Sequence, residues 1–374
     1  MKETMNKKIT KATICLMLGL TLFATGCGKK KKKADTSTTT EATTVTTTEE
    51  VTTGTTTEEK TTEATTEADK HKGLVQSDLT GEWVKPEEAA KRPVGVMINN
   101  IDISWPQSGV SKADVIYEMT CEGGITRFLA LFTDYSGLDK IGSIRSARQY
   151  FVVKALEHDA ILAHVGGSTY GLSAIKDYGV DDIEGLYESV FYRSDDRYAP
   201  HNCYLSADGI NESIADHGYR TEHDSSYKST FSFNEEDKDL EKGEKCTFLD
   251  VRYNSFTEPY YEYDEKTKVY SRSEYGMEHV DDQTNTQLTF KNVLIVITSV
   301  SGMPDGKYND VTLNGSGSGY YATNGKIIPI TWKKDGDYSV TEYFTEDGKP
   351  LLLNPGKTFV QYFDEEDVSG IQWE

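Results

Sequence analysis

The chain has 374 residues and a formal net charge of −21, and after residue 72 its 51 acidic side chains outnumber 28 basic ones. Such an acidic body excludes extended binding to the phosphate backbone of nucleic acid and broad adhesion to anionic lipid or polymer, so any bound anion requires a local site. Of the five cysteines, only Cys121, Cys203 and Cys246 follow the N-terminal segment, and three thiols allow at most one disulfide. The length predicts a leader and about two domains, and no pattern predicts a cofactor or a metal site.

The first 27 residues have the pattern of a bacterial lipoprotein signal peptide. Basic residues precede an apolar run over 12–24, which is shorter than the roughly 20 residues of a membrane-spanning helix. The run ends in Leu22-Phe-Ala-Thr-Gly-Cys27, which resembles the lipobox, where small residues precede a cysteine that accepts lipid. We therefore predict a signal peptide over 1–27, lipidation of Cys27, and an extracytoplasmic protein that is lipid-anchored to the bacterial cell membrane. The alternative is an ordinary secretory leader or an uncleaved anchor.

Residues 28–75 have the composition of a tether. A lysine run over 29–33 follows the lipidation site and suits contact with anionic lipid headgroups, or simple solvation. From Ala34 to Lys72 the chain consists mainly of Thr, Glu and Ala, with almost no large apolar side chain. Such a segment cannot bury enough surface to offset its loss of conformational entropy, so we predict a disordered Thr-rich linker. Its role would be to hold a folded body away from the membrane.

A first globular region is expected over 82–222, where apolar runs typical of buried strands alternate with helical patterns. Strands are predicted at 92–100, 113–119, 125–132, 160–165 and 202–205, and helices at 169–178 and 207–217, together with a helix that ends at about residue 157. Ser206 is the expected N-cap of the last helix. Strands that interleave with helices predict a layered mixed α/β domain.

A second, β-rich region is expected over 245–374, after a polar boundary segment at 221–245. A hairpin is predicted at 260–271 and a buried strand at 292–298, and three further hairpin turns are expected at Asn324-Gly325, Asp335-Gly336 and Asp347-Gly348. The segment 314–320, rich in Gly and Ser, is expected to be a flexible loop. Taken together, the two regions predict an α+β fold.

The stretch 141–157 predicts a short strand that leads into a helix, with Arg145 and Arg148 at the junction. Two arginines at a helix start are unusual, because the first turn already carries the positive end of the helix dipole. We therefore predict an anion pocket at this junction, which Arg127 could join from the neighbouring strand. The alternative is that these arginines pair with Asp114, Glu118 and Glu122 in a buried polar network.

Other residue patterns allow chemistry but have simpler explanations. Glu118 and Glu122 could act as a carboxylate pair on sugars, or could be arginine partners or surface charge. His164 and Ser168 flank a Gly-Gly turn that could form an anion nest or a nucleophile and base, or a tight turn with a capping serine. The candidate ligand-binding residues are Arg127, Arg145, Arg148, Glu118, Glu122, His164, Gly166, Gly167, Ser168 and Asn202.

Several blocks of the chain resemble the YerB-like family of bacterial lipoproteins, from about residue 82 to the C-terminus. These blocks are Arg92–Asn100, Pro106–Glu118, Glu122–Arg127, Ile141–Arg148, His164–Ser168 and Pro200–Asn202, and Gly356-Lys-Thr358 lies in the part that resembles the family's second domain. The resemblance implies a two-part extracytoplasmic lipoprotein. It implies no reaction, because the family is a domain of unknown function.

Three functions remain open from the sequence. The first is a binding module that recognises an anionic envelope ligand or a protein partner, with the membrane contacted through the lipid anchor and no nucleic acid bound. The second is an envelope hydrolase or transferase that acts on wall material. The third is a structural partner in an envelope complex. A cluster of Arg145, Arg148, His164, Ser168 and Glu122 around one open pocket would favour a ligand site or an enzyme, and burial of these residues in mutual pairs would favour the structural role.

Overall fold

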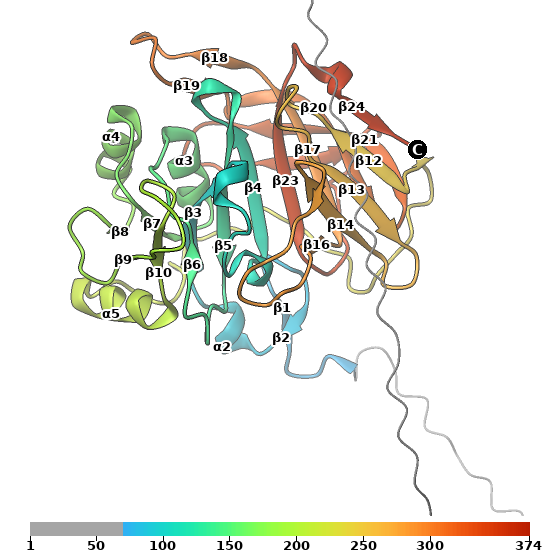
Figure 1. Cartoon of the computed structure of the whole chain (residues 1–374). Coiled ribbons are helices and arrows are strands. Elements are labelled where there is room, and N and C mark those ends of the chain that lie inside the picture. Colours follow the sequence, from blue (N-terminus) through green and yellow to red (C-terminus); the bar gives the residue numbers. More distant parts are fainter. Residues whose placement is uncertain (1–69) are drawn as a thin grey trace, which may run out of the picture. The chain divides into compact units, whose positions relative to one another are not determined.

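A mixed sheet of eleven strands forms the centre of the computed structural model, which describes residues 70–374 (Figure 1). Most of its strands follow the order β11-β21-β20-β17-β23-β4-β5-β3-β7-β8, and β22 pairs with β21. Their bounds are β3 Val94–Asn100, β4 Val115–Thr120, β5 Thr126–Phe132, β7 Ile161–His164, β8 Asp182–Glu184, β11 Glu244–Lys245, β17 Asn292–Thr298, β20 Gly315–Thr323, β21 Lys326–Lys334, β22 Glu342–Thr345 and β23 Thr358–Asp364. All seven residues of β3 and of β5 are buried, because both faces of the sheet are covered.

Strand β23 joins the two regions that were predicted from the sequence. It lies between β17 and β4 and runs parallel to both, so that Val360 is opposite Leu294 on one side and Tyr117 on the other. Strands from 82–222 and from 245–374 therefore belong to a single sheet, and the described residues 70–374 lie in one compact unit. The division of the chain at 222 and 245 stays a prediction.

Two hydrophobic cores lie on opposite faces of the central sheet. One contains Ile116 and Phe359 with side chains from a second sheet and from helix α5 (Ala207–His217), and the other contains Tyr117 and Val360 with side chains from helices α3 (Gln149–Glu157) and α4 (Thr169–Tyr178). The second sheet consists of β12 Phe248–Val251, β13 Tyr260–Asp264, β14 Val269–Glu274, β15 Met277–Glu278, β16 Thr289–Phe290 and β24 Ile371–Trp373. The layers are thus a small sheet with α5, the large sheet, and a helical layer.

Helices are few, and the structure is mostly β-sheet. They are α2 Pro86–Ala89, α3 Gln149–Glu157, α4 Thr169–Tyr178 and α5 Ala207–His217, with 3₁₀ turns at Asp102–Ser104, Val110–Lys112, Glu122–Gly124 and Val368–Gly370. The remaining short strands are β1 Val75–Gln76, β2 Trp83–Val84, β6 Ile141–Gly142, β9 Tyr192–Arg193, β10 Cys203–Leu205, β18 Val300–Gly302 and β19 Asn309–Val311. Within residues 70–374, no helix has the length and apolar content needed to cross a bilayer.

The helices α4 and α5 begin and end where local signals in the sequence place them. Ser168 and Ser206 each accept a backbone N–H three residues ahead, and Gly179 and Gly218 end the helices with positive φ angles of 65° and 67°. Both helices have the predicted bounds. The predicted α+β fold is confirmed in part, because the structure contains both helices and strands but is β-rich overall.

The prediction of a flexible loop at 314–320 is wrong, because residues 315–320 lie in strand β20, which is paired on both sides, with β21 and with β17. Glycine is required there by close approach from neighbouring strands. A Cβ atom on Gly319 would lie 2.2 Å from the carbonyl oxygen of Ile295, and one on Gly317 would lie 2.6 Å from the indole nitrogen of Trp332. Glycine in a strand marks such close contacts rather than flexibility.

Replacement of Gly319 by Ala should therefore destabilise the protein by about 2 kcal/mol, since the strands must separate to admit a methyl group. Gly302→Ala is the matched control, because a Cβ atom at that position in β18 would meet no heavy atom within 4 Å. Thermal unfolding of both variants measures the effect. Equal melting temperatures for the two variants would contradict the packing argument.

Candidate functional site

The stretch 141–150 crosses the end of the central sheet from one core to the other. Ile141 and Ile144 pack in the core beneath the small sheet, whereas Ala147 and Tyr150 pack in the core beneath the helices. Backbone hydrogen bonds hold the crossing in place, from Arg145 N–H to the carbonyl of Met97 at 2.9 Å and from Ala147 N–H to that of Gly166 at 2.9 Å. Because β3 and β7 are parallel, the crossing lies at the carboxyl ends of both strands, where open α/β sheets commonly bind ligands.

Arg148 is an internal brace. Its Nε and Nη2 atoms donate to the two carboxylate oxygens of Glu122 at 2.8 and 2.6 Å, and its Nη1 atom donates to the carbonyl of Ala147 at 2.9 Å. The ring of Tyr308, from the turn between β18 and β19, lies 5.1 Å from the guanidinium carbon. Burial favours the neutral form of Glu122, but the ion pair outweighs it and lowers the pKa of this carboxyl. Of the two hypotheses for the arginine junction, internal pairing with a carboxylate therefore describes Arg148 and Glu122.

Arg127 and Arg145 are different, because among residues 70–374 no carboxylate lies within ion-pair distance of either. Arg127 is 4% exposed, donates from Nη1 to the carbonyl of Ser146 at 2.7 Å, and leaves its buried Nε–H without a partner among the described residues. Arg145 is half-buried and donates to the carbonyl of Pro200 at 3.2 Å. Burial and the nearby charges of Arg127 and Arg148 lower the pKa of Arg145 to about 10. Among residues 70–374, therefore, only one of these three guanidinium groups, that of Arg148, has a carboxylate partner.

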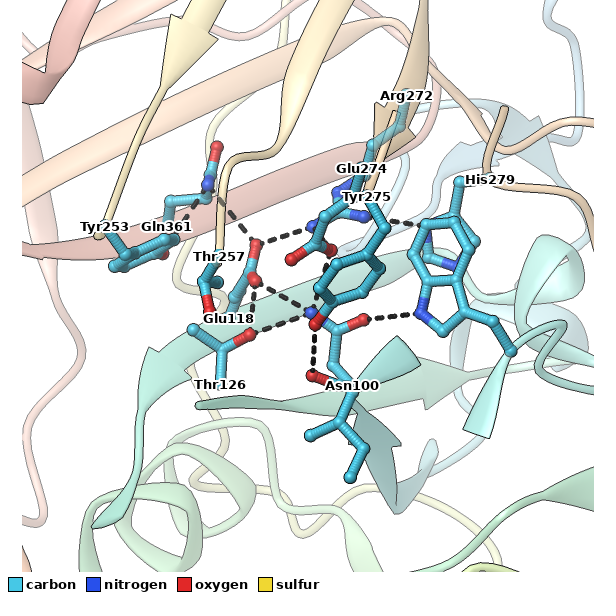
Figure 2. A network of polar contacts seen from close by, with 12 residues as sticks. Asn100, Glu118, Thr126, Tyr253, Thr257, Arg272, Glu274, Tyr275, His279 and Gln361 are labelled. Carbon is cyan, nitrogen blue, oxygen red and sulfur yellow. Dashed lines mark hydrogen bonds and ion pairs between the residues drawn. The ribbon is translucent and has the colours of Figure 1, made fainter. Parts of the chain in front are cut away.

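Glu118 belongs to a separate network on the other face of the sheet, which we call the buried polar network (Figure 2). Its Oε1 atom accepts from Asn100 and Thr126 at 3.1 and 2.6 Å, and its Oε2 atom accepts from Arg272 at 3.1 Å. The network contains Asn100, Glu118, Thr126, Tyr253, Thr257, Arg272, Glu274, Tyr275, His279 and Gln361. Glu118 is therefore not a partner of Glu122, and its side chain is fully buried.

Two carboxylates in the buried polar network share one guanidinium group. Arg272 Nη2 lies 3.1 Å from Glu118 and 2.9 Å from Glu274, and all three side chains have 0% exposure. His279 accepts from Arg272 Nη1 at 2.7 Å, and burial together with the Arg272 charge keeps the pKa of His279 well below its usual range. Burial raises the pKa of Glu274 to about 7 despite Arg272. Only Oε2 of Glu274 accepts hydrogen bonds, from Asn100 and Arg272, so a proton on Oε1 breaks none.

The stability of the protein should fall as the pH rises from about 5 to 8. The pKa of Glu274 is raised from 4.5 in the unfolded chain to about 7 in the fold, so the folded state binds more protons across this range. Glu274→Gln mimics the protonated acid and should flatten this part of the profile, which urea denaturation at several pH values measures. Glu278→Gln, on the exposed strand β15, is the control. A Glu274→Gln profile as steep as that of the native chain would contradict the assignment.

His164 and Ser168 do not form a nucleophile and base. His164 bonds through Nε2 to Asp182 at 3.1 Å and through Nδ1 to the carbonyl of Gly166 at 2.9 Å, while the Ser168 hydroxyl caps α4. Burial lowers the pKa of His164, but Asp182 and Glu184 outweigh it, so the net shift is upward. The turn at Gly166 and Gly167 lets the backbone pass from β7 to α4.

The remaining candidates have local structural contacts. Asn202 bridges Arg193 and the carbonyl of Ser194, and the Asp114 carboxylate accepts the backbone N–H of Thr133. Cys121, Cys203 and Cys246 are buried free thiols. Within the described part of the chain, no group of three or more His, Cys, Asp or Glu side chains is arranged to hold a metal ion. Cys27, the predicted lipidation site, lies outside the described residues.

The sequence did not single out Arg272, Glu274, His279 or Tyr308. One available signal was the alternation of Tyr270, Arg272 and Glu274, which places two opposite charges on the same strand face as an aromatic ring. All three are buried in the structure. Tyr308 carried no such signal, because its contact with Arg148 depends on the path of the chain between β18 and β19.

Comparisons with known proteins agree with the arrangement of the chain. Residues 79–220 match the model "Protein of unknown function (DUF3048) N-terminal domain", and residues 249–360 match the corresponding C-terminal domain. The chain is 31% identical over 300 residues to the Bacillus subtilis (strain 168) protein named "Putative lipoprotein YerB". The aligned residues cover 79% of this chain and 88% of that protein. The crystal structure of YerB from Bacillus subtilis superposes with a TM-score of 0.71 at 30% identity, over 80% of this chain and 99% of that chain. The chain therefore belongs to the YerB-like family.

Proposed function

We propose that this protein is a lipid-anchored binding module whose folded body binds an anionic envelope ligand at the arginine cluster, defined as Arg127, Arg145 and Arg148. One observation carries the proposal. Three guanidinium groups lie close enough for Arg127 and Arg148 to lower the pKa of Arg145, whereas among residues 70–374 a single carboxylate, that of Glu122, pairs with the cluster.

Like charges in a half-buried place cost free energy unless an anion compensates them. Within the described part of the chain, the buried Arg127 has an unpartnered Nε–H, and Arg145 keeps most of its five N–H donors free after its bond to Pro200. Arg148 is committed to Glu122 and Tyr308, so its role is to position the crossing and to contribute charge. An incoming anion would thus bind Arg145, with the positive charges of Arg127 and Arg148 nearby.

Purified full chain should bind inorganic phosphate or acetate in a manner that depends on Arg145, as measured by isothermal titration. Arg145→Gln should weaken binding of the preferred anion by at least tenfold, since a charge-assisted pair contributes about 1.5 to 3 kcal/mol. Arg252→Gln is the control, because Arg252 is 52% exposed and pairs with Asp250 and Glu258. Equal affinities of the native chain and the Arg145→Gln variant for the anion would contradict the proposed anion site.

The anchoring part of the proposal rests on the sequence before Cys27 and on the word lipoprotein in the name of the Bacillus relative. A dually acylated N-terminus holds a protein stably on a bilayer, and the Thr-rich linker would give the body reach. Cells fed an alkyne fatty acid should label the native chain and a Cys15→Ser variant, whose change lies in the apolar leader. A Cys27→Ser variant that still carries label would contradict lipidation at Cys27.

A further inference from the structure

A cavity of about 400 Å³ lies where the turn between β13 and β14 meets the residues that precede β17 and β23. Its charged lining consists of Lys266, Lys268, Lys291, Lys357, Glu82 and Asp237. Because β17 and β23 run parallel to β3, their starts lie at the opposite end of the large sheet from the arginine cluster. We propose that this cavity, which we call the lysine pocket, binds a phosphate group independently of the arginine cluster.

Positive charge is in excess in the lysine pocket, in contrast to the acidic body around it. Four lysines and two carboxylates line the pocket, whereas after residue 72 the chain holds 51 acidic and 28 basic side chains. The carboxylate of Asp237 is shared, since it lies 2.7 Å from the ammonium of Lys291 and 3.4 Å from that of Lys268. Among residues 70–374, no carboxylate lies within ion-pair distance of Lys266 or Lys357. Two ammonium groups are therefore available to an incoming anion.

Lys357 is held in place with part of its charge uncompensated. Its Nζ atom donates to the carbonyl of Ser111, and its own carbonyl accepts the backbone N–H of Lys291 at 3.0 Å. The other two N–H donors of the ammonium have no partner among the described residues. Burial lowers the pKa of Lys357, and the nearby charge of Asp114 does not fully offset this effect. A bound anion would stabilise this ammonium group.

The donors around the lysine pocket suit a phosphate group better than a carboxylate. Ammonium groups are compact point charges that bind phosphate oxygens from several directions, whereas the planar guanidinium fork matches a carboxylate. Thr267 and Thr289 add hydroxyl groups to the lining. Gly356 also lines the pocket, and a Cβ atom there would lie 2.7 Å from the Cβ atom of Lys291, so the bare backbone lets this lysine pack closely. Ammonium and hydroxyl donors from separate segments of the chain fit the tetrahedrally arranged oxygens of phosphate.

The lysine pocket adjoins the point at which the described chain begins. His71 lies 3.2 Å from Glu236, which precedes Asp237, and its ring stacks on that of Trp83 at a centroid distance of 4.0 Å. A chain held to a bilayer through Cys27, as proposed above, would bring headgroup phosphates to the body at high effective concentration. A lipid headgroup is therefore the expected source of the phosphate.

The test uses the purified full chain with Arg145→Gln, so that the arginine cluster makes no contribution. Isothermal titration compares acetate with two phosphate probes, inorganic phosphate and glycerophosphoglycerol, the soluble headgroup of phosphatidylglycerol. The headgroup should bind more tightly than acetate, and Lys266→Gln and Lys357→Gln should each weaken its binding by about fivefold or more. Lys266 is exposed on a turn, so its replacement leaves the fold intact. Lys176→Gln, which changes an exposed lysine of α4, is the control and should leave the affinity unchanged.

Glu82 provides a test in the opposite direction. Its exposed side chain lines the lysine pocket and, within the described part of the chain, has no lysine or arginine at ion-pair distance. Because its carboxylate repels an anion in the pocket, Glu82→Gln should tighten binding of the phosphate probes several-fold.

The relative affinities of the two phosphate probes identify the source of the phosphate. Tighter binding of glycerophosphoglycerol supports a lipid headgroup, and tighter binding of inorganic phosphate supports the pocket with a soluble ligand. Acetate that binds as tightly as both phosphate probes would overturn the inference, as would absence of binding by both. Phosphate binding that is unchanged in Lys266→Gln and in Lys357→Gln would also overturn it. The proposed anion site is tested separately through Arg145, so failure of either site leaves the other in place.

Discussion

Replacement of Arg272 by Met should destabilise the protein by about 3 to 5 kcal/mol, the effect measured when one partner of a buried ion pair is removed. The side chains of Arg272, Glu118 and Glu274 all have 0% exposure, so the variant leaves two carboxylates in the protein interior without their cation. Methionine fills much of the same volume between Phe128 and Phe359, whose rings lie 5.2 and 5.1 Å from the guanidinium carbon. Loss of charge rather than loss of packing therefore dominates.

The loss should grow with pH, because burial raises the pKa of Glu274 even beside Arg272, and without Arg272 this carboxyl holds its proton more tightly in the fold as the pH rises. Urea denaturation at pH 5 and pH 8 measures this dependence. Arg252→Met is the matched control and should change stability by less than 1 kcal/mol, since Arg252 is 52% exposed and its ion pairs are in water. An Arg272→Met variant as stable as the control would show that the buried polar network is dispensable.

Replacement of Glu157 by Gln should have an effect of similar size, about 3 to 5 kcal/mol at pH 7. The Glu157 carboxylate lies 2.9 Å from the ammonium of Lys154 and 3.1 Å from that of Lys334, and all three side chains have 0% exposure. It also accepts the backbone N–H of Thr341 at 2.8 Å, so it joins α3 to the segment after β21. The amide of Gln would leave two ammonium groups buried without a negative charge.

The pH dependence of this variant has a defined sign. Burial opposes the charge on Glu157, but Lys154 and Lys334 outweigh it and hold the pKa of this carboxyl well below its usual range. Its contribution is therefore fully present above pH 4.5 and is lost as the pH falls below that value. The difference between native chain and variant should shrink in acid, whereas Glu342→Gln, on an exposed position of β22, should change little at any pH. A difference that widens in acid would contradict this account.

Local signals in the sequence predicted helices α4 and α5 well, because a capping serine and a terminal glycine act within a few residues. The same reasoning failed at β20. The glycines of that strand resemble a flexible loop when only their neighbours in sequence are considered, and the contacts that require them come from Ile295 and Trp332 on other strands. Composition alone cannot distinguish a glycine that frees the backbone from one that admits a neighbouring atom.

The candidate site was predictable in part for the same reason. Arg148 and Glu122 are separated by 26 positions, and their ion pair was one of two alternatives at the outset. Glu118 was grouped with Arg148 and Glu122 because it is close to them in sequence, but its side chain lies on the other face of the large sheet. Its partner there, Arg272, lies 154 positions away in the second sheet. Strand alternation shows that a side chain faces a core, but not which distant strand lies opposite.

The place of β23 between β17 and β4 has a consequence for how such a chain is made. Strand β4 ends at Thr120 and its partner β23 begins at Thr358, so one edge of β4 stays unpaired until nearly the whole chain is available. Contacts of such long sequence separation form slowly, and an open strand edge invites pairing with other molecules. Because synthesis proceeds from the N-terminus, the first half of the chain cannot complete its sheet before β23 has been made. Strand β23 therefore completes the fold, and a chain cut before Thr358 should aggregate rather than fold as a smaller domain.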